Sequence, residues 1–474
     1  MKNFDNAHDV KWGDLFSSGR AIYTITILIG ISLHAMDAFI ISTLMPSIII
    51  DLGNSKFYSW VLMLYMTSSI IGSASANIVN NKFGSRNGYI FAGIVFLAGT
   101  IVSGLSNSMY ILLIGRIISG AGAGLIVAQN TALISKFFSE NLRSRMIALL
   151  STVWATAALT GPLIGGIFAE INFWRGGFLF AIPLIIFFIF TAFKAIPREN
   201  NNKKNDSTFP IWRITILGFG VFLIGCTGIF DLNILKIFSL ISGIVFLYLT
   251  VYLDNKFHKT GIFPKNSFSL NNASGTAYWF FILMSILPVA IGIYMPLAYQ
   301  LIYAIKPIFA GYLSAILAIF WSIGATCVAG FSLKKQSYAL VIGPLVSFLG
   351  SLGIALGIGT FSWIYIAIFT AIAGLGIGIC MGHLMNWTMT LSNKEEQSIT
   401  ASSIHTVRSL GIAIGAAVSG LIANLSGLGT SLEKSTVISA ISNVEAFSSV
   451  SPAIAVIFAF LLIRHRKILT KKLK

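Results

Sequence analysis

The chain has 474 residues, of which 56% are hydrophobic and only 10% are charged, and its mean hydropathy is +0.85. Soluble domains carry about 25% charged residues, so this composition excludes an ordinary soluble domain and indicates an all-α, polytopic membrane protein. The net charge of +17 is spread over short segments between apolar runs, a placement that argues against a nucleic-acid partner. Cys226, Cys327 and Cys380 lie in apolar runs without CxxC spacing, so neither a disulfide nor a metal site is expected.

Apolar runs long enough to cross a bilayer recur along the whole chain, since a spanning helix needs about 20 residues. Fourteen transmembrane helices are predicted, at 22–44, 59–79, 88–105, 110–135, 146–168, 177–193, 214–230, 237–253, 276–301, 308–332, 337–357, 362–390, 398–426 and 447–463. The runs 214–230 and 237–253 are short and interrupted by polar residues. Twelve spans are therefore the alternative, with 214–253 as a re-entrant or interfacial pair.

The placement of Lys and Arg predicts that both termini are cytoplasmic, because cytoplasmic loops carry an excess of these residues. With an even number of spans, most basic residues fall on the cytoplasmic side. The exceptions are Lys56, Arg175, Lys236, Lys306 and Lys434, which face outward, and Arg116 and Arg408, which lie within spans. The segments outside the spans are too short for a catalytic domain, so the protein is not expected to be an enzyme.

Asp37, in the first span, is predicted to be the only acidic residue deep inside an apolar run. A carboxylate at that depth is costly and usually functional. A carboxylic acid among apolar groups holds its proton more tightly than in water, so Asp37 is expected to exchange protons or to bind a cationic substrate. The alternative is a carboxylate permanently satisfied by a partner.

The fifth predicted span combines Gly161, Pro162, Gly165 and Gly166. Small residues let helices approach closely in lipid, and proline favours a kink, so simple helix packing would account for the pattern. The pattern also resembles the GPxxGG antiporter motif of the major facilitator superfamily, with Ala157 where the family often has a glycine. Further segments resemble the fourteen-span drug/proton antiporter (EmrB/QacA-like) branch of that superfamily, namely 36–46, 60–65, 113–122, 173–183, 294–300, 310–312 and 402–415.

This resemblance implies a major facilitator fold with two six-helix bundles and two extra helices between them. The implied organisation is a cytoplasmic tail 1–21, an N-terminal bundle 22–194, a linker with two spans 195–265, a C-terminal bundle 266–464 and a basic cytoplasmic tail 465–474. The loop between spans two and three, which helps to hold one conformation in the family, is degraded here. Its predicted motif residues are Asn77, Asn81, Lys82, Gly84 and Arg86, with Asn81 in place of the family's aspartate.

Arg116 is the expected partner of Asp37, because the resemblance places spans one and four in the same bundle and both residues lie roughly 10 Å below the outer boundary. Its alternatives are snorkelling to the interface or bonding to backbone carbonyls. His34 precedes Asp37 by one helical turn, and its ordinary titration range suits a proton relay. A histidine that is merely hydrogen-bonded is the alternative.

The substrate cavity is expected to include side chains from spans that line the cavity in the family. Aromatic rings offer cation–π contacts to lipophilic cations, although core packing is the alternative for each residue alone. The predicted cavity residues are Tyr65, Trp154, Tyr299, Gln300, Asn386 and Trp387.

The predicted function is proton-coupled antiport that exports amphiphilic, cationic small molecules such as drugs by alternating access. One alternative is export of an endogenous metabolite, siderophore or lipid, and another is a non-transporting sensor or scaffold that keeps the fold. The proton gradient is the expected energy source, with no cofactor. We expect a monomer in the plasma (cytoplasmic or inner) membrane, joined by a periplasmic adaptor protein if the source is a bacterium with two membranes.

Overall fold

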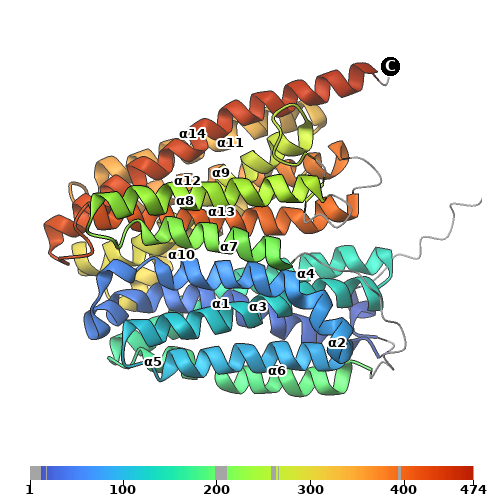
Figure 1. Ribbon diagram of the computed structural model, residues 1–474, viewed down its shortest axis with the longest axis horizontal. Coiled ribbons are helices and arrows are strands. Elements are labelled where there is room, and N and C mark those ends of the chain that lie inside the picture. The colour runs from blue at the N-terminus through green and yellow to red at the C-terminus, as the bar shows by residue number, and fades with distance from the viewer. Residues whose placement is uncertain are drawn as a thin grey trace, which may run out of the picture.

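A computed structural model of the chain describes residues 12–17, 19–197, 211–257, 263–264, 266–392 and 397–472. The regular structure in this part is helical, and long helices run side by side along the molecule (Figure 1). The 3-10 helix Trp12–Leu15 and the C-terminal end of α14 (Lys434–Lys472) lie at the same end (Figure 1), which we name the tail end. The opposite end is named the far end.

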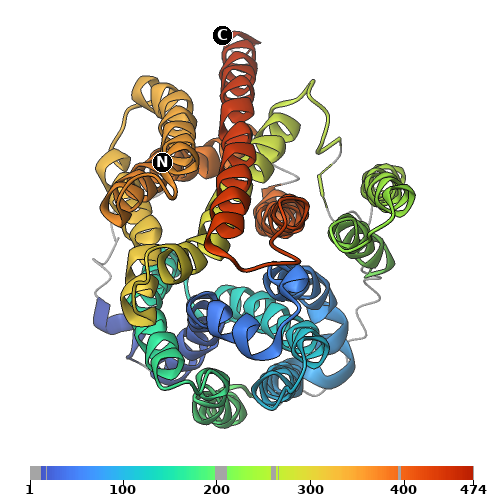
Figure 2. The ribbon, with the colours of Figure 1, turned by 90° about the vertical axis from the view of Figure 1, so that its left-hand side faces the viewer.

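The N-terminal bundle lies in the lower half of both ribbon views (Figures 1 and 2). It follows a short 3-10 helix, Trp12–Leu15. Its helices are α1 (Ala21–Leu52), α2 (Trp60–Gly104, preceded by the 3-10 helix Ser55–Phe57), α3 (Met109–Phe137), α4 (Glu140–Glu170), α5 (Arg175–Leu179) and α6 (Ile182–Ala195).

Helix α2 contains two arms that meet at Gly84, where the backbone leaves the helical region with φ 79° and ψ 160°. Only glycine adopts such a conformation readily. In the first arm Tyr65 approaches Gly120 of α3, and in the second arm Phe96 approaches Gly122. The first arm therefore runs parallel to α3 and the second runs back along it, as the two predicted spans 59–79 and 88–105 require.

The C-terminal bundle forms the upper half of the molecule, and α7 and α8 stand at its periphery (Figure 2). Helix α7 packs against α2 and α13 as well as against α8. The helices of this half are α7 (Ile211–Cys226), α8 (Asn233–Lys256), α9 (Ala273–Leu297, continued by the π-helix Ala298–Ile302), α10 (Pro307–Val328), α11 (Leu333–Gly357), α12 (Trp363–Leu391), α13 (Gln397–Leu425) and α14 (Lys434–Lys472).

Twelve helices within the described ranges are long and apolar enough to cross a membrane. That number takes the two arms of α2 as one helix and leaves out the shorter apolar helix Trp212–Cys226. Fourteen crossings and cytoplasmic termini therefore stay predictions, while an all-helical, multi-pass membrane fold is established.

Helix α14 is much longer than the predicted span 447–463, because it begins at Lys434. The sequence places residues 427–444 between the predicted spans 398–426 and 447–463. In this segment Val437, Ala440, Ile441 and Val444 are all buried, and this spacing of three or four marks one face of a helix. Mean hydropathy misses such a segment because its other face is polar.

The two bundles are joined by hydrogen bonds toward the far end in the described part of the chain. Tyr58 Oη donates to the Ile293 carbonyl at 3.0 Å, and Gln300 Nε2 donates to the Thr43 carbonyl at 3.2 Å. Ser55 Oγ donates to the Leu428 carbonyl at 2.6 Å. These bonds connect α1 and the segment before α2 to α9, to its π-helical continuation and to the turn after α13, so the far end is closed in this conformation.

Candidate functional site

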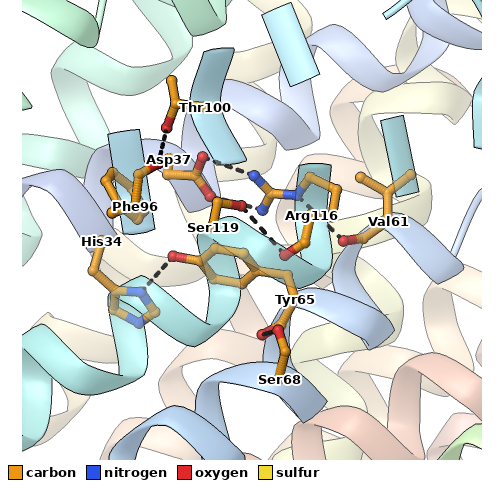
Figure 3. A network of polar contacts seen from close by, with 9 residues as sticks. All are labelled: His34, Asp37, Val61, Tyr65, Ser68, Phe96, Thr100, Arg116 and Ser119. Atoms are coloured by element: carbon orange, nitrogen blue, oxygen red, sulfur yellow. Dashed lines mark hydrogen bonds and ion pairs between the residues drawn. The ribbon is translucent and has the colours of Figure 1, made fainter. Parts of the chain in front are cut away.

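Asp37 and Arg116 form a bidentate ion pair between α1 and α3 (Figure 3). Arg116 Nη1 donates to Asp37 Oδ1 at 2.9 Å, and Nη2 donates to Oδ2 at 2.7 Å. The side chain of Arg116 is 1% exposed and that of Asp37 is 12% exposed. A parallel pair of charge-assisted bonds is the strongest contact that these two groups make.

Arg116 has further contacts that hold the guanidinium in place. Its Nε donates to the Val61 carbonyl at 3.4 Å, and its Cζ lies 4.1 Å from the centre of the Tyr65 ring. Both residues belong to the first arm of α2. A cation over an aromatic face is attracted by the ring quadrupole, so Arg116 would keep two contacts if Asp37 were neutral.

His34 extends the set of polar contacts around Asp37 and Arg116 toward the other bundle. His34 Nδ1 and Tyr65 Oη lie 2.8 Å apart, and the His34 ring meets Trp154 of α4 edge-on at 5.8 Å. Trp154 is 41% exposed. His34 also interacts electrostatically with His405 of α13, so the polar group that begins at Asp37 reaches residues from both bundles.

Glycines on α3 explain why Arg116 lies so close to α2. A β-carbon at Gly120 would collide with Ser68 and Tyr65, and one at Gly122 would collide with the backbone of Phe96. Because these positions carry no side chain, α3 contacts both arms of α2 directly. The close approach places Arg116 beside Val61 and Tyr65.

The opposite face of Asp37 borders a small, mainly apolar pocket between α1, the second arm of α2, and α5 and α6. Met36, Phe96, Thr100 and Phe178 are among its lining residues. The carboxylate therefore has apolar surroundings on the side away from Arg116.

The GPxxGG residues lie where α4 meets α1 and α10. A β-carbon at Gly161 would collide with Phe39, and one at Gly165 would stand 2.8 Å from the Ile40 carbonyl oxygen. Gly166 faces the other bundle, where a β-carbon would stand 2.5 Å from the Ile308 Cα. Pro162 packs against Gly311 of α10. The motif thus forms part of the contact between the bundles.

The motif residues between spans two and three lie around the turn of α2. Asn77, Asn81 and Lys82 are exposed, and Gly84 provides the reversal. The Arg86 guanidinium lies over the Phe193 ring of α6 at 3.8 Å. The turn is therefore held to α6 of its own bundle by a cation–π contact.

The predicted cavity residues differ in their exposure. Trp154 and Asn386 are exposed, and Gln300 joins the bundles through Thr43. Tyr65, Tyr299 and Trp387 are buried, and Trp387 donates from Nε1 to Gln336 Oε1 at 2.8 Å. These three rings are enclosed by their neighbours in this conformation, and their place in the substrate cavity stays a prediction.

Two ionisable residues of the C-terminal bundle were not among the predicted site residues. Glu445 of α14 is 0% exposed, so Asp37 is not the only acid deep in the apolar part of the molecule. Arg408 of α13 lies near Trp321 of α10 at 5.9 Å, and its buried Nε has no hydrogen-bond partner among the described residues. The helical spacing of 437, 440, 441 and 444 was the signal that would have placed Glu445 in a helix.

Comparison with known proteins agrees with this architecture. A model of the Major Facilitator Superfamily matches residues 27–416. The chain belongs to the major facilitator superfamily. A solved structure similar to this transporter is that of a POT family transporter in complex with a thioalcohol conjugated peptide. The TM-score is 0.65 and the identity 14%, and 95% of this chain and 97% of the other are covered.

Two curated relatives cover most of this transporter. A probable multidrug-efflux transporter of Mycobacterium tuberculosis (strain H37Rv) is 28% identical over 435 residues, which cover 87% of this chain and 90% of the relative. Multidrug resistance protein 3 of Bacillus subtilis (strain 168) is 24% identical over 404 residues, which cover 84% and 78% respectively. Family and fold together make this a membrane transport protein for small molecules, not an enzyme.

Proposed function

We propose that this transporter is a proton-coupled antiporter that exports amphiphilic, drug-like molecules, with Asp37 and Arg116 as its proton-coupling pair. The observation that carries the proposal is the bidentate ion pair in the apolar interior of the N-terminal bundle. Two relatives named for multidrug efflux and multidrug resistance support the substrate class. The proposal includes fourteen crossings in the cytoplasmic membrane, with the tail end facing the cytoplasm.

Coupling follows from competition for the Asp37 carboxylate. A proton, the Arg116 guanidinium and a substrate cation are all attracted to it, and a neutral carboxyl binds a cation far less well. Protonation therefore weakens the ion pair and releases Arg116 to its contacts with Val61 and Tyr65. Deprotonation restores the pair. This gives the N-terminal bundle two arrangements that differ by one proton.

The polar contacts beyond Arg116 connect this change to the substrate. Tyr65 touches Arg116 through its ring and His34 through its hydroxyl. His34 in turn contacts Trp154, whose exposed ring suits an amphiphilic ligand. A shift of Arg116 on protonation is thus passed through Tyr65 and His34 to a surface where a substrate can bind.

The charge expected on the substrate also has a structural basis. The ring of Trp154 offers a cation–π surface, and His34, which meets this ring edge-on, interacts electrostatically with Asp37. Arg408 and His405 line the opposing bundle without an acidic partner in the described part of the chain. A second positive charge on the substrate would meet these groups, so we propose monovalent lipophilic cations as the preferred class.

Alternating access requires the bundles to part at one end and close at the other. The closed far end of this structure is held by the contacts of Tyr58, Gln300 and Gly166. With the tail end in the cytoplasm, this conformation is closed toward the outside.

The test is substrate-triggered proton movement in everted membrane vesicles that carry the full chain. A preformed pH gradient should collapse on addition of a lipophilic cation with the native protein and not with Asp37→Asn. Asp51→Asn is the matched control, because Asp51 lies on the same helix and forms an ion pair with Arg175 at 3.0 Å, yet is 49% exposed.

The outcomes separate the alternatives. Proton flux with the native protein and Asp51→Asn but not with Asp37→Asn supports the proposal. Equal flux with Asp37→Asn removes Asp37 from coupling, and absence of flux with cations, anions and neutral amphiphiles alike overturns antiport of such compounds.

A further inference from the structure

Glu445 lies in the C-terminal bundle, three helical turns into α14 and about 16 Å along the axis from its start at the far end. Its side chain is 0% exposed. Helices α9, α11 and α13 pack against α14. An acidic residue at this depth needs compensation for the water that it has lost.

The compensation available to an ionised Glu445 is small. Ser351 Oγ of α11 lies 3.0 Å from Glu445 Oε2 and also 2.9 Å from the Glu445 backbone carbonyl, so its one hydroxyl proton is shared between them. Glu445 Oε1 is enclosed and has no hydrogen-bond partner among the described residues. No ion pair of the described chain includes Glu445.

The neighbouring helices bring no cation to Glu445 in the described part of the molecule. From α9 the facing titratable group is the Tyr294 phenol, which interacts with Glu445 electrostatically and whose buried hydroxyl lies near Ser59. The charged groups of α13, His405 and Arg408, lie deeper from the far end than Glu445, and neither forms an ion pair with it among the described residues. Tyr299, next to α14, has its hydroxyl close to Thr370.

An isolated buried carboxylate would cost several kcal/mol, whereas a neutral carboxyl needs only ordinary hydrogen bonds. The surroundings of Glu445 therefore suit the protonated side chain. This is the reverse of Asp37, whose guanidinium partner suits the ionised form.

The position of Glu445 relates it to the closure between the bundles. Tyr294 lies beside Tyr58 of the N-terminal bundle, with ring centres 5.5 Å apart, and close to Ser59. Tyr58 also donates to the carbonyl of Ile293. When the far end opens, Tyr58 and Ser59 must leave α9, and the path from Tyr294 to Glu445 is uncovered.

We propose that Glu445 is a second proton-binding site, which holds its proton while the far end is closed and exchanges it with the far-side solution when Tyr58 and Ser59 separate from α9. This inference rests on the proposed antiport, in which the far end opens once in each cycle. It places one proton site in each bundle, with Asp37 ionised and Glu445 neutral in the conformation seen here.

The first test measures the proton directly, by infrared difference spectroscopy of the purified full chain on exchange from water to heavy water. The native protein and Asp37→Asn should both show the stretch of a protonated, buried carboxylic acid. Glu445→Gln should lose this band. Glutamine is chosen because it has the shape of the neutral acid and keeps an oxygen that can accept a hydrogen bond from Ser351. A band that persists in Glu445→Gln, or its absence in the native protein, overturns the inference.

The second test is proton release per substrate in everted vesicles. Glu445→Gln should release roughly half the protons of the native protein, since one of two sites is lost, while Asp37→Asn should abolish substrate-triggered release. A purely structural Glu445 predicts native stoichiometry in Glu445→Gln, and that result overturns the role in transport. If native vesicles show no flux, the proposed antiport fails, whereas the infrared band still decides whether Glu445 carries a proton.

Discussion

The two bundles of this transporter each bury an acidic side chain, and they compensate for it in opposite ways. Asp37 of the N-terminal bundle receives two hydrogen bonds from a guanidinium that is itself 1% exposed. Glu445 of the C-terminal bundle receives part of one hydroxyl hydrogen bond and no cation in the described structure. The charge that such an acid carries therefore depends on the partner beside it.

The difference gives the two acids complementary behaviour. A paired carboxylate releases its partner when a proton arrives, so Asp37 can change the position of Arg116. An unpaired carboxyl has nothing to release, so Glu445 can only hold or lose its proton as its exposure changes. The N-terminal bundle is therefore suited to transmit the protonation of Asp37, and the C-terminal bundle is suited to change the protonation of Glu445 when the far end opens.

The largest effect is expected from breaking the ion pair. Arg116→Gln should lower the free energy of unfolding by about 3–5 kcal/mol, because it leaves a buried carboxylate without its charge partner. The double variant Asp37→Asn with Arg116→Gln should recover much of this loss, which thermal unfolding of the purified protein would measure. Asp51→Asn breaks the exposed pair with Arg175 and should cost no more than about 1 kcal/mol. Equal losses in both single variants would contradict the importance of burial.

A smaller effect is expected from loosening the closure that covers Glu445. Gly166→Ala places a β-carbon against the Ile308 backbone, and overpacking of this kind costs about 1–3 kcal/mol. The far end should open more often, so a cysteine at Ser55 should react with a polar maleimide about fivefold faster or more, after alanine replaces the three native cysteines. Gly292→Ala is the control, since a β-carbon there meets nothing within 4 Å. An unchanged rate in Gly166→Ala would show that this glycine does not control closure.

The sequence predicted the general architecture and the Asp37–Arg116 contact more successfully than the surfaces around them. Apolar runs and an acid at membrane depth are local signals, and the depth of Arg116 on a helix of the same bundle made it the natural partner. Whether Tyr299 or Trp387 faces a cavity or a neighbouring helix depends on how its helix is rotated about its own axis, which hydropathy does not encode. Both side chains are buried in this conformation.

Glu445 is a buried residue that the hydropathy of the sequence did not reveal. It follows a polar stretch that hydropathy assigned to a loop, yet one face of that stretch is apolar at helical spacing and packs into the bundle. The turn of α2 at Gly84 is a further case, because its backbone conformation is visible only in three dimensions. Averaged hydropathy finds helices that are apolar all round and misses those with two different faces.

The unpaired state of Glu445 predicts a pH dependence of stability. A group that is protonated when folded and ionised when unfolded releases a proton on unfolding, so stability falls as pH rises. The loss approaches about 1.4 kcal/mol per pH unit for a single proton. The native protein should therefore lose thermal stability as the pH rises above about 4.3, where an exposed Glu ionises, until the folded side chain ionises as well, and Glu445→Gln should lose less. The same slope in Glu445→Gln and the native protein would assign the dependence to other groups.

The smallest expected change tests whether Asp37 communicates beyond its ion pair. Tyr65→Phe keeps the ring over Arg116 and removes the hydroxyl that bonds His34, at a cost of about 1 kcal/mol of stability. Tyr89→Phe is the matched control, because Tyr89 is buried in the same bundle and its hydroxyl bonds Asn130 of α3. Both variants should lose similar stability, but only Tyr65→Phe should reduce proton release per substrate in everted vesicles. Equal release in the two variants would confine coupling to Asp37 and Arg116 and would remove Tyr65 and His34 from the path, since the Glu445 site in the other bundle is untouched by either change.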